Sequence, residues 1–180
     1  MAELGERTVS DTPAHLGAVL ARDLEALRKE IDAFPDDPSV WLTLPGVTNA
    51  AGTLALHVCG NLKHFVGAVL GHTGFVRDRD GEFNQRGLSR AQLGRDIAET
   101  VEVVRATLGR LPADALAAPY PATPNNLTLP TGLFLLHLAA HLAFHLGQAG
   151  YLRRIATGDA RPTGAMSLAA LGAPPAPPPR

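Results

Sequence analysis

Histidines are the side chains in this sequence whose spacing most directly indicates chemistry. Five of the seven histidines lie in two weakly charged segments, two of them near position 60 and three between positions 137 and 145. His141 and His145 are four residues apart, so on a helix they share one face, about 6 Å apart along the axis. His57, from a neighbouring helix, can supply a third nitrogen and leave a coordination position for water or substrate. The spacing suits a metal site, but hydrogen-bonded core histidines would show the same pattern.

The other histidines of these segments, and the cysteine between them, are weaker candidates for metal ligands. By spacing alone, His137 could chelate a metal together with His141, because it lies one turn earlier on the same face. His64 lies about 10 Å along the helix from His57, too far to bind the same ion, so we expect it to pack or to line a pocket. Cys59 is the single cysteine. It points about 200° away from His57 around the helix and is expected to be an inert core residue.

Two amides lie within one helical turn of the candidate ligands. Asn61 follows His57 by four residues and Gln148 follows His145 by three. Both could therefore orient a ligand or hydrogen-bond a metal-bound water molecule. Ordinary helix packing explains either amide equally well, so both interpretations stay open.

Acidic residues in the segment 77–83 are the alternative source of a catalytic base. We expect them to be solvated or paired locally, as charge runs usually are; they are Asp78, Asp80 and Glu82, beside Arg77 and Arg79. Neither HLAAH nor HLAFH contains the glutamate of the HExxH metalloprotease motif, which disfavours a peptidase of that type. No glycine-rich run follows a strand and opens a helix, as phosphate-binding or dinucleotide-binding turns require.

Four segments have the apolar period of helices, at residues 11–31, 49–70, 90–108 and 130–157. Ser89 is the expected N-cap of the third helix. The charged segment 77–83 and the proline-rich segment 112–130 are predicted to be loops. Because no alternating strand pattern occurs, the predicted fold class is all-α, a four-helix bundle. It forms a single domain over residues 1–160, followed by a Pro/Ala-rich tail over 161–180.

Composition favours the same fold and excludes several function classes. Among 180 residues, 46% are hydrophobic but only 5% aromatic, which suits packed helices in one domain. The net charge of −1 provides no basic field for nucleic acid or an anionic membrane. Residues 38–62 and 115–152 lack charged side chains, yet prolines, asparagine and histidines interrupt them. We therefore expect helices surrounded by other helices rather than membrane spans. Without an apolar N-terminal leader, a cytoplasmic protein is expected.

Three segments of the sequence resemble the DinB/YfiT-like superfamily, most closely a bacterial DinB-like subgroup of expected metalloenzymes. They are NAAGTLALHVCGNLKHFVGAVLG at 49–71, RDRDGEF at 77–83 and HLAFHLGQAGYLRR at 141–154. The resemblance covers residues 41–158, and its HxxxHxGQ ending is the most specific part. It implies an up-down-down-up bundle, often dimeric, that holds a divalent metal through His57, His141 and His145. His137 would then lie next to the ligands or in the core.

The resemblance also implies thiol-dependent S-transferase-like chemistry on a small molecule. Characterised relatives include transferases and isomerases that use bacillithiol, mycothiol or glutathione, and a bound metal would deprotonate such a thiol. Arg79 or the loop around Tyr120 could contact the thiol. The alternatives are a small metal-dependent hydrolase and a non-catalytic metal-binding stress or assembly protein, so whether the protein is an enzyme is left open. Three imidazoles suit zinc, nickel, copper or iron; we name zinc or nickel first, with iron next. A homodimer is the expected assembly.

Overall fold

The structure is a computed structural model that describes residues 11–172, and within this range the chain is helical. Its long helices are α1 (Thr12–Asp32), α2 (Ala51–Leu62), α4 (Arg90–Leu108) and α5 (Thr131–Thr157). A short helix, α3 (Arg79–Asn84), lies between α2 and α4. No strand occurs among these residues, which confirms the all-α class. Residues 1–10 of the predicted domain and 173–180 of the predicted tail lie outside the described range.

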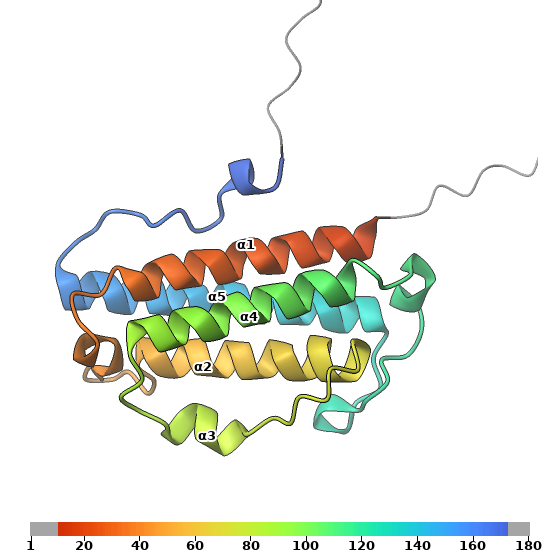
Figure 1. The fold of residues 1–180 in the computed structure, drawn as a ribbon, viewed down its shortest axis with the longest axis horizontal. Coiled ribbons are helices and arrows are strands. Elements are labelled where there is room, and N and C mark those ends of the chain that lie inside the picture. Colours follow the sequence, from red (N-terminus) through yellow and green to blue (C-terminus); the bar gives the residue numbers. More distant parts are fainter. Residues whose placement is uncertain (1–10, 173–180) are drawn as a thin grey trace, which may run out of the picture.

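The four long helices lie side by side (Figure 1). Helix α1 packs against α4 and α5, and α2 packs against the same two helices, so α1 and α2 are diagonal to each other. Following the chain in Figure 1, α1 and α5 run in one direction while α2 and α4 run in the other. This is the up-down-down-up order that the resemblance implied. The short α3 lies outside the bundle against α2.

Local sequence signals account for where the long helices begin and end. The side chain of Ser89 accepts a hydrogen bond from the backbone N–H of Gln92, and Oε1 of Gln92 accepts one from the backbone N–H of Ser89. This capping box satisfies amides that a helix N-terminus leaves unpaired, and α4 begins where Ser89 predicted. One stripe of α4 is buried in the core: Leu93, Ile97, Val101, Val104 and Leu108. Helix α5 ends at Gly158, whose φ of 68° is the left-handed conformation that glycine adopts easily.

The second predicted helix covers residues 49–70, but its last part has a different geometry. After Leu62 the chain continues as a π-helix, Lys63–Leu70. Two glycines of this region face α4 at very short range: a Cβ on Gly67 would lie 2.7 Å from Val103, and one on Gly71 would lie 2.4 Å from Thr107. The wider π-helical backbone therefore packs directly against α4. Periodicity alone could not distinguish it from an α-helix.

The outer face of α5 departs from the sequence-based expectation. The low charge of this helix was expected to reflect burial on all sides, but several large apolar side chains of one face are more than half exposed: Leu133, Leu136, Phe144, Tyr151 and Ile155. Among residues 11–172, α5 is the one helix long and apolar enough to cross a membrane by length and composition. Its other faces are buried against α1 and α2, and this arrangement is compatible with a soluble protein.

The chain after α5 returns over α1, as Figure 1 shows. Arg153 and Glu30 form an ion pair with 2.9 Å between Nε and Oε2, and each side chain is only 2% exposed. The Arg153 guanidinium also donates to the backbone carbonyls of Asp159 and Arg161, and Thr163 donates to Glu30. These contacts attach the beginning of the predicted tail to α1 and α5.

Candidate metal centre

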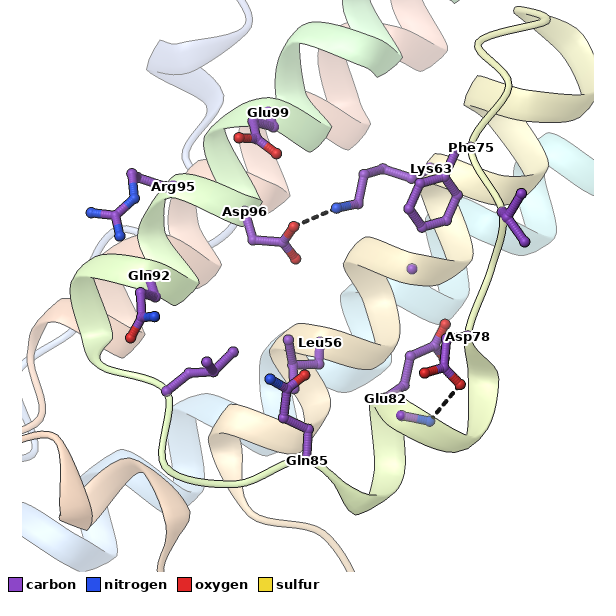
Figure 2. A pocket seen from close by; sticks show the side chains of 14 residues that line it. Leu56, Lys63, Phe75, Asp78, Glu82, Gln85, Gln92, Arg95, Asp96 and Glu99 are labelled. Carbon is purple, nitrogen blue, oxygen red and sulfur yellow. Dashed lines mark hydrogen bonds and ion pairs between the residues drawn. The ribbon is translucent and has the colours of Figure 1, made fainter.

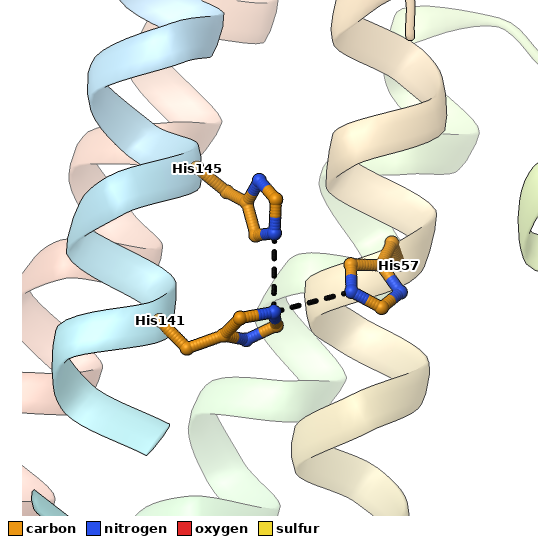
Figure 3. Close-up of side chains that lie close together, drawn as sticks. All are labelled: His57, His141 and His145. Carbon is orange, nitrogen blue, oxygen red and sulfur yellow. Dashed lines mark hydrogen bonds between the residues drawn. The ribbon is translucent and has the colours of Figure 1, made fainter. Parts of the chain in front are cut away.

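Three histidines from two helices meet between α2 and α5. His57 lies on α2 and is 7% exposed, whereas His141 and His145 are half-buried on the face of α5 that packs against α2. Figure 3 shows the three imidazole rings pointing toward one another across the helix interface. The bundle therefore brings together the three residues that the sequence and the resemblance selected.

The distances between the ring nitrogens suit a common ion. Nε2 of His141 lies 3.1 Å from Nε2 of His145 and 3.3 Å from Nε2 of His57. One nitrogen from each ring lies within 4.8 Å of the other two. Two imidazole nitrogens bound to one tetrahedral zinc at 2.0–2.1 Å are about 3.3 Å apart. The donor set and its spacing therefore fit a divalent metal.

Oxygen atoms on the far side of two rings set their orientation. His57 Nδ1 lies 3.0 Å from Oε2 of Glu82, and His145 Nδ1 lies 2.7 Å from Oε1 of Gln148. Because both oxygens act as acceptors, each ring donates its Nδ1–H and keeps the Nε2 lone pair for the centre. Metal-binding histidines commonly have such oxygen partners.

The environment of His141 and His145 lowers the pKa of both rings. Burial, together with the positive charge of Arg77 and of the neighbouring histidines when they are protonated, lowers the pKa of His141 from its ordinary value of 6.5 to about 4. Burial also lowers the pKa of His145, and the hydrogen bond to Gln148 only partly opposes this shift. At neutral pH both rings therefore have lone pairs available to a cation.

Glu82 is the functional residue that the sequence analysis underestimated. Segment 77–83 was expected to be a loop whose acids are solvated or paired locally, but residues 79–84 form α3, capped by Asp78, whose side chain accepts from the backbone N–H of Gly81. This helix turns Glu82 inward, where it is 7% exposed. An aspartate followed by further acids is a helix N-terminus signal that could have indicated the helix. It could not have indicated that one acid is buried.

The Glu82 carboxylate links α3 to α2 and to the segment that precedes α3. It accepts hydrogen bonds from Arg77 at 2.6 and 2.8 Å as well as from His57, so the expected local pairing with arginine is present. Burial raises the pKa of Glu82, but the hydrogen bonds from Arg77 and His57 outweigh it and keep the pKa below its usual value. A Cβ on Gly60 would lie 2.1 Å from Oε1 of Glu82. The glycine therefore makes room for the carboxylate against α2.

The other sequence candidates have distinct positions. Gln148 contacts His145 as described, whereas Asn61 is buried one turn from His57, and its Oδ1 has no hydrogen-bond partner among the described residues. His137 is exposed, and its ring stacks with that of His141 at 6.1 Å between centroids. His64 packs against Phe65, as expected for a residue outside the metal site.

A cavity of about 240 Å³ opens beside the centre. His57, His141 and His137 line it together with Asn61 and both arginines of the α3 region, Arg77 and Arg79. The loop around Tyr120 reaches this cavity through Pro124 and Asn125. Tyr120 itself is 4% exposed and donates its hydroxyl to the carbonyl of Phe65, so its role is structural.

A second cavity of about 430 Å³ lies between α3 and α4 (Figure 2). Glu82 and Gly60 line it, but none of the three clustered histidines does. The ion pair between Lys63 and Asp96 crosses it, as the dashed line in Figure 2 shows. Glu82 thus separates this cavity from the histidines, and the candidate centre opens into the smaller cavity.

Comparison with known proteins yields one match. The family model for the DinB superfamily matches residues 5–149, a range that contains His57, His141, His145 and Gln148. No curated protein and no solved structure matches the chain.

Proposed function

Because this chain belongs to the DinB superfamily and clusters three imidazoles, we propose that it is a divalent-metal-dependent enzyme. In this proposal His57, His141 and His145 are the metal ligands. Its reaction is thiol-dependent S-transferase-like chemistry on a small molecule. The observation that carries the proposal is the convergence of three Nε2 atoms, two of which belong to residues that line a cavity.

The number of ligands favours a catalytic over a structural metal. Structural zinc sites are normally closed by four protein ligands, whereas catalytic sites keep a position for water or substrate. Within residues 11–172 the cluster has three members, and two of them also line the cavity. A substrate in the cavity would therefore reach the same centre.

A divalent ion in such a centre lowers the pKa of a thiol or water molecule bound to it. The remaining work falls to side chains of this chain. Gln148 and Glu82 keep His145 and His57 turned toward the centre. Phe65, Phe134 and Leu138 provide the apolar part of the cavity lining, against which a small substrate can pack.

His137 is the proposed proton acceptor. It is exposed, lines the same cavity and stacks on His141. In the proposed reaction the thiol proton passes to His137 while the sulfur forms a bond to an electrophilic carbon. The leaving group departs with the electron pair of the bond that breaks.

Elemental analysis of chelator-free protein is the first test. We expect about one equivalent of zinc, nickel or iron per chain, and loss of that metal in a His141→Ala, His145→Ala double variant that keeps its helical circular dichroism. A variant with His15→Ala and His72→Asn is the matched control, because both residues are exposed and lie outside the cluster. His72 has a φ of 52°, which asparagine tolerates. Wild-type protein that stays free of metal even after incubation with these ions would refute the proposal.

Activity is then measured with the metal-loaded protein. Conjugation of low-molecular-weight thiols to 1-chloro-2,4-dinitrobenzene should exceed the uncatalysed rate and fall after chelation or in His57→Ala. If instead p-nitrophenyl acetate is hydrolysed without any thiol, the metal-dependent hydrolase is supported in place of the transferase. If neither substrate reacts and the metal is bound in full, a non-catalytic metal-binding protein is the better description.

A further inference from the structure

We propose that the cavity beside the histidines recognises an anionic group of the substrate through Arg79, so that the thiol used by this protein carries a carboxylate. This inference rests on the proposed function and names the substrate class of the same site. Its basis is the charge of the cavity, the partners of its two arginines and an unpartnered amide.

The cavity has a cationic lining. Two arginines and three histidines contribute to it, and no aspartate or glutamate does. Arg77 is engaged, because its guanidinium donates twice to Glu82. Arg79 is exposed and makes no ion pair among the described residues; its one recorded contact is with the ring of Phe83, 5.4 Å from Cζ to the centroid. The charge of Arg79 is therefore available to a ligand.

The Phe83 side chain contacts both Arg79 and His57 of the candidate metal centre. The Phe83 ring lies 4.8 Å from that of His57 between centroids, and Arg79 lies over the same Phe83 ring. The guanidinium and the His57 ring thus lie against the same aromatic side chain. One small molecule can place a sulfur at the histidines and an anionic group at Arg79.

Asn61 provides an independent indication of a ligand. This residue is 8% exposed and lines the cavity, yet its Oδ1 has no hydrogen-bond partner. Buried side-chain amides in folded proteins nearly always find partners, so this oxygen keeps the capacity to accept a hydrogen bond that the described residues do not supply. The apolar part of the lining, Phe65, Phe134 and Leu138, suits an aliphatic segment between the two polar ends.

A matched pair of thiols tests this inference. The probes are 6-mercaptohexanoate and 6-mercaptohexanol, which have the same chain length and differ in the carboxylate. Cobalt-loaded protein reports thiol binding through its sulfur-to-cobalt charge-transfer absorption. We expect the wild-type protein to bind the acid at least about tenfold more tightly than the alcohol, since a bond between guanidinium and carboxylate is charge-assisted.

Variants assign the preference to one side chain. Arg79→Gln should bind the acid and the alcohol with equal affinity, and it should fold normally because Arg79 is exposed. Arg86→Gln is the matched control: Arg86 is also exposed, follows α3 directly and does not line the cavity, so the preference should persist. Equal affinities in the wild-type protein, or an unchanged preference in Arg79→Gln, would overturn the inference while leaving the proposed function standing.

Hexanoate, which has no thiol, separates the two proposals. Its binding to the metal-loaded protein, measured by calorimetry, should weaken in Arg79→Gln and not in Arg86→Gln. If neither thiol produces a charge-transfer band, the thiol-dependent function fails, and hexanoate alone then decides whether the cavity recognises a carboxylate. Absence of hexanoate binding under those conditions would refute the inference as well.

Discussion

Replacing Glu82 by glutamine should weaken metal binding without moving any of the three histidines. The substitution preserves the shape of the side chain and removes the charge that faces Nδ1 of His57 at 3.0 Å. Glutamine can still accept a hydrogen bond from His57, but it can also turn its amide N–H₂ toward the ring. The carboxylate therefore does two things that glutamine does less well: it fixes the proton on Nδ1 and it makes the imidazole a stronger donor to a cation.

The expected size of this effect follows from the burial of the pair. The side chains of His57 and Glu82 are 9% and 6% exposed, so their hydrogen bond is poorly screened by water. A hydrogen bond to a charged group contributes about 1.5–3 kcal/mol. If the whole free energy of this hydrogen bond is lost from zinc binding in Glu82→Gln, zinc affinity falls by about 10- to 100-fold.

Zinc affinity is measured by competition with a chromophoric chelator at neutral pH. The matched control is Glu102→Gln, which makes the same charge change at an exposed position of α4. Urea unfolding of the metal-free proteins is measured separately, because Glu82 also pairs with Arg77, whose side chain is 12% exposed. Loss of that ion pair should lower the free energy of unfolding, an effect independent of zinc.

Gly60→Ala is a second substitution that tests whether the Glu82 carboxylate supports metal binding. It retains the charge, but its Cβ would lie 2.1 Å from Oε1 and 2.7 Å from Cδ of Glu82, so the carboxylate must move away from α2. Alanine usually stabilises a helix by about 1 kcal/mol relative to glycine; here we expect lower stability and weaker zinc binding. Zinc affinities of both Glu82→Gln and Gly60→Ala within about threefold of the wild type would refute the idea that Glu82 supports the centre.

Three further predictions concern other parts of the molecule. The Cys59 side chain is fully buried, and burial raises the pKa of its thiol. A thiol reagent should therefore modify the native protein more than about a hundredfold more slowly than the unfolded protein. Equal rates of modification would contradict this prediction. Because the pKa of His141 falls from 6.5 when unfolded to about 4 when folded, protonation favours the unfolded chain, and the metal-free protein should lose stability as the pH decreases from about 6.5 to about 4. Urea unfolding across this range checks the slope, which His141→Gln should reduce. The exposed apolar face of α5 should support the expected homodimer, since its large side chains are more than half exposed and contiguous apolar patches of this kind mark protein–protein interfaces. Light scattering should show monomers for Phe144→Glu but dimers for the control Val76→Glu, which is 87% exposed elsewhere; a monomeric wild type would exclude this dimer.

The helices were predicted well wherever their signals are local. Helix α4 covers residues 90–108 and α5 covers 131–157, close to the predicted bounds, because a capping residue or a left-handed glycine marks their ends. The second helix was predicted in extent but not in geometry. Its π-helical end packs closely on α4 at Gly67 and Gly71, a tertiary contact that no local pattern contains.

The candidate site was predicted in part. Spacing of four residues indicated that His141 and His145 share a face, since that relation depends only on helical geometry. It left His137 as an equal alternative, and the family resemblance selected the later pair. Which helix supplies the third imidazole depends on how α2 packs on α5, and the structure brings His57 to 3.3 Å from His141.

The sequence by itself thus determined the all-α class, the positions of the long helices and the paired histidines, because periodicity, caps and i to i+4 spacing act within one turn or one helix. Tertiary structure alone decided that Glu82 lies inside against His57 while the other acids of its segment stay exposed, since α3 must dock on α2 at Gly60 for this to occur. It likewise decided that one apolar face of α5 remains uncovered. Burial of a side chain is a property of its neighbours, and those neighbours come from distant parts of the chain.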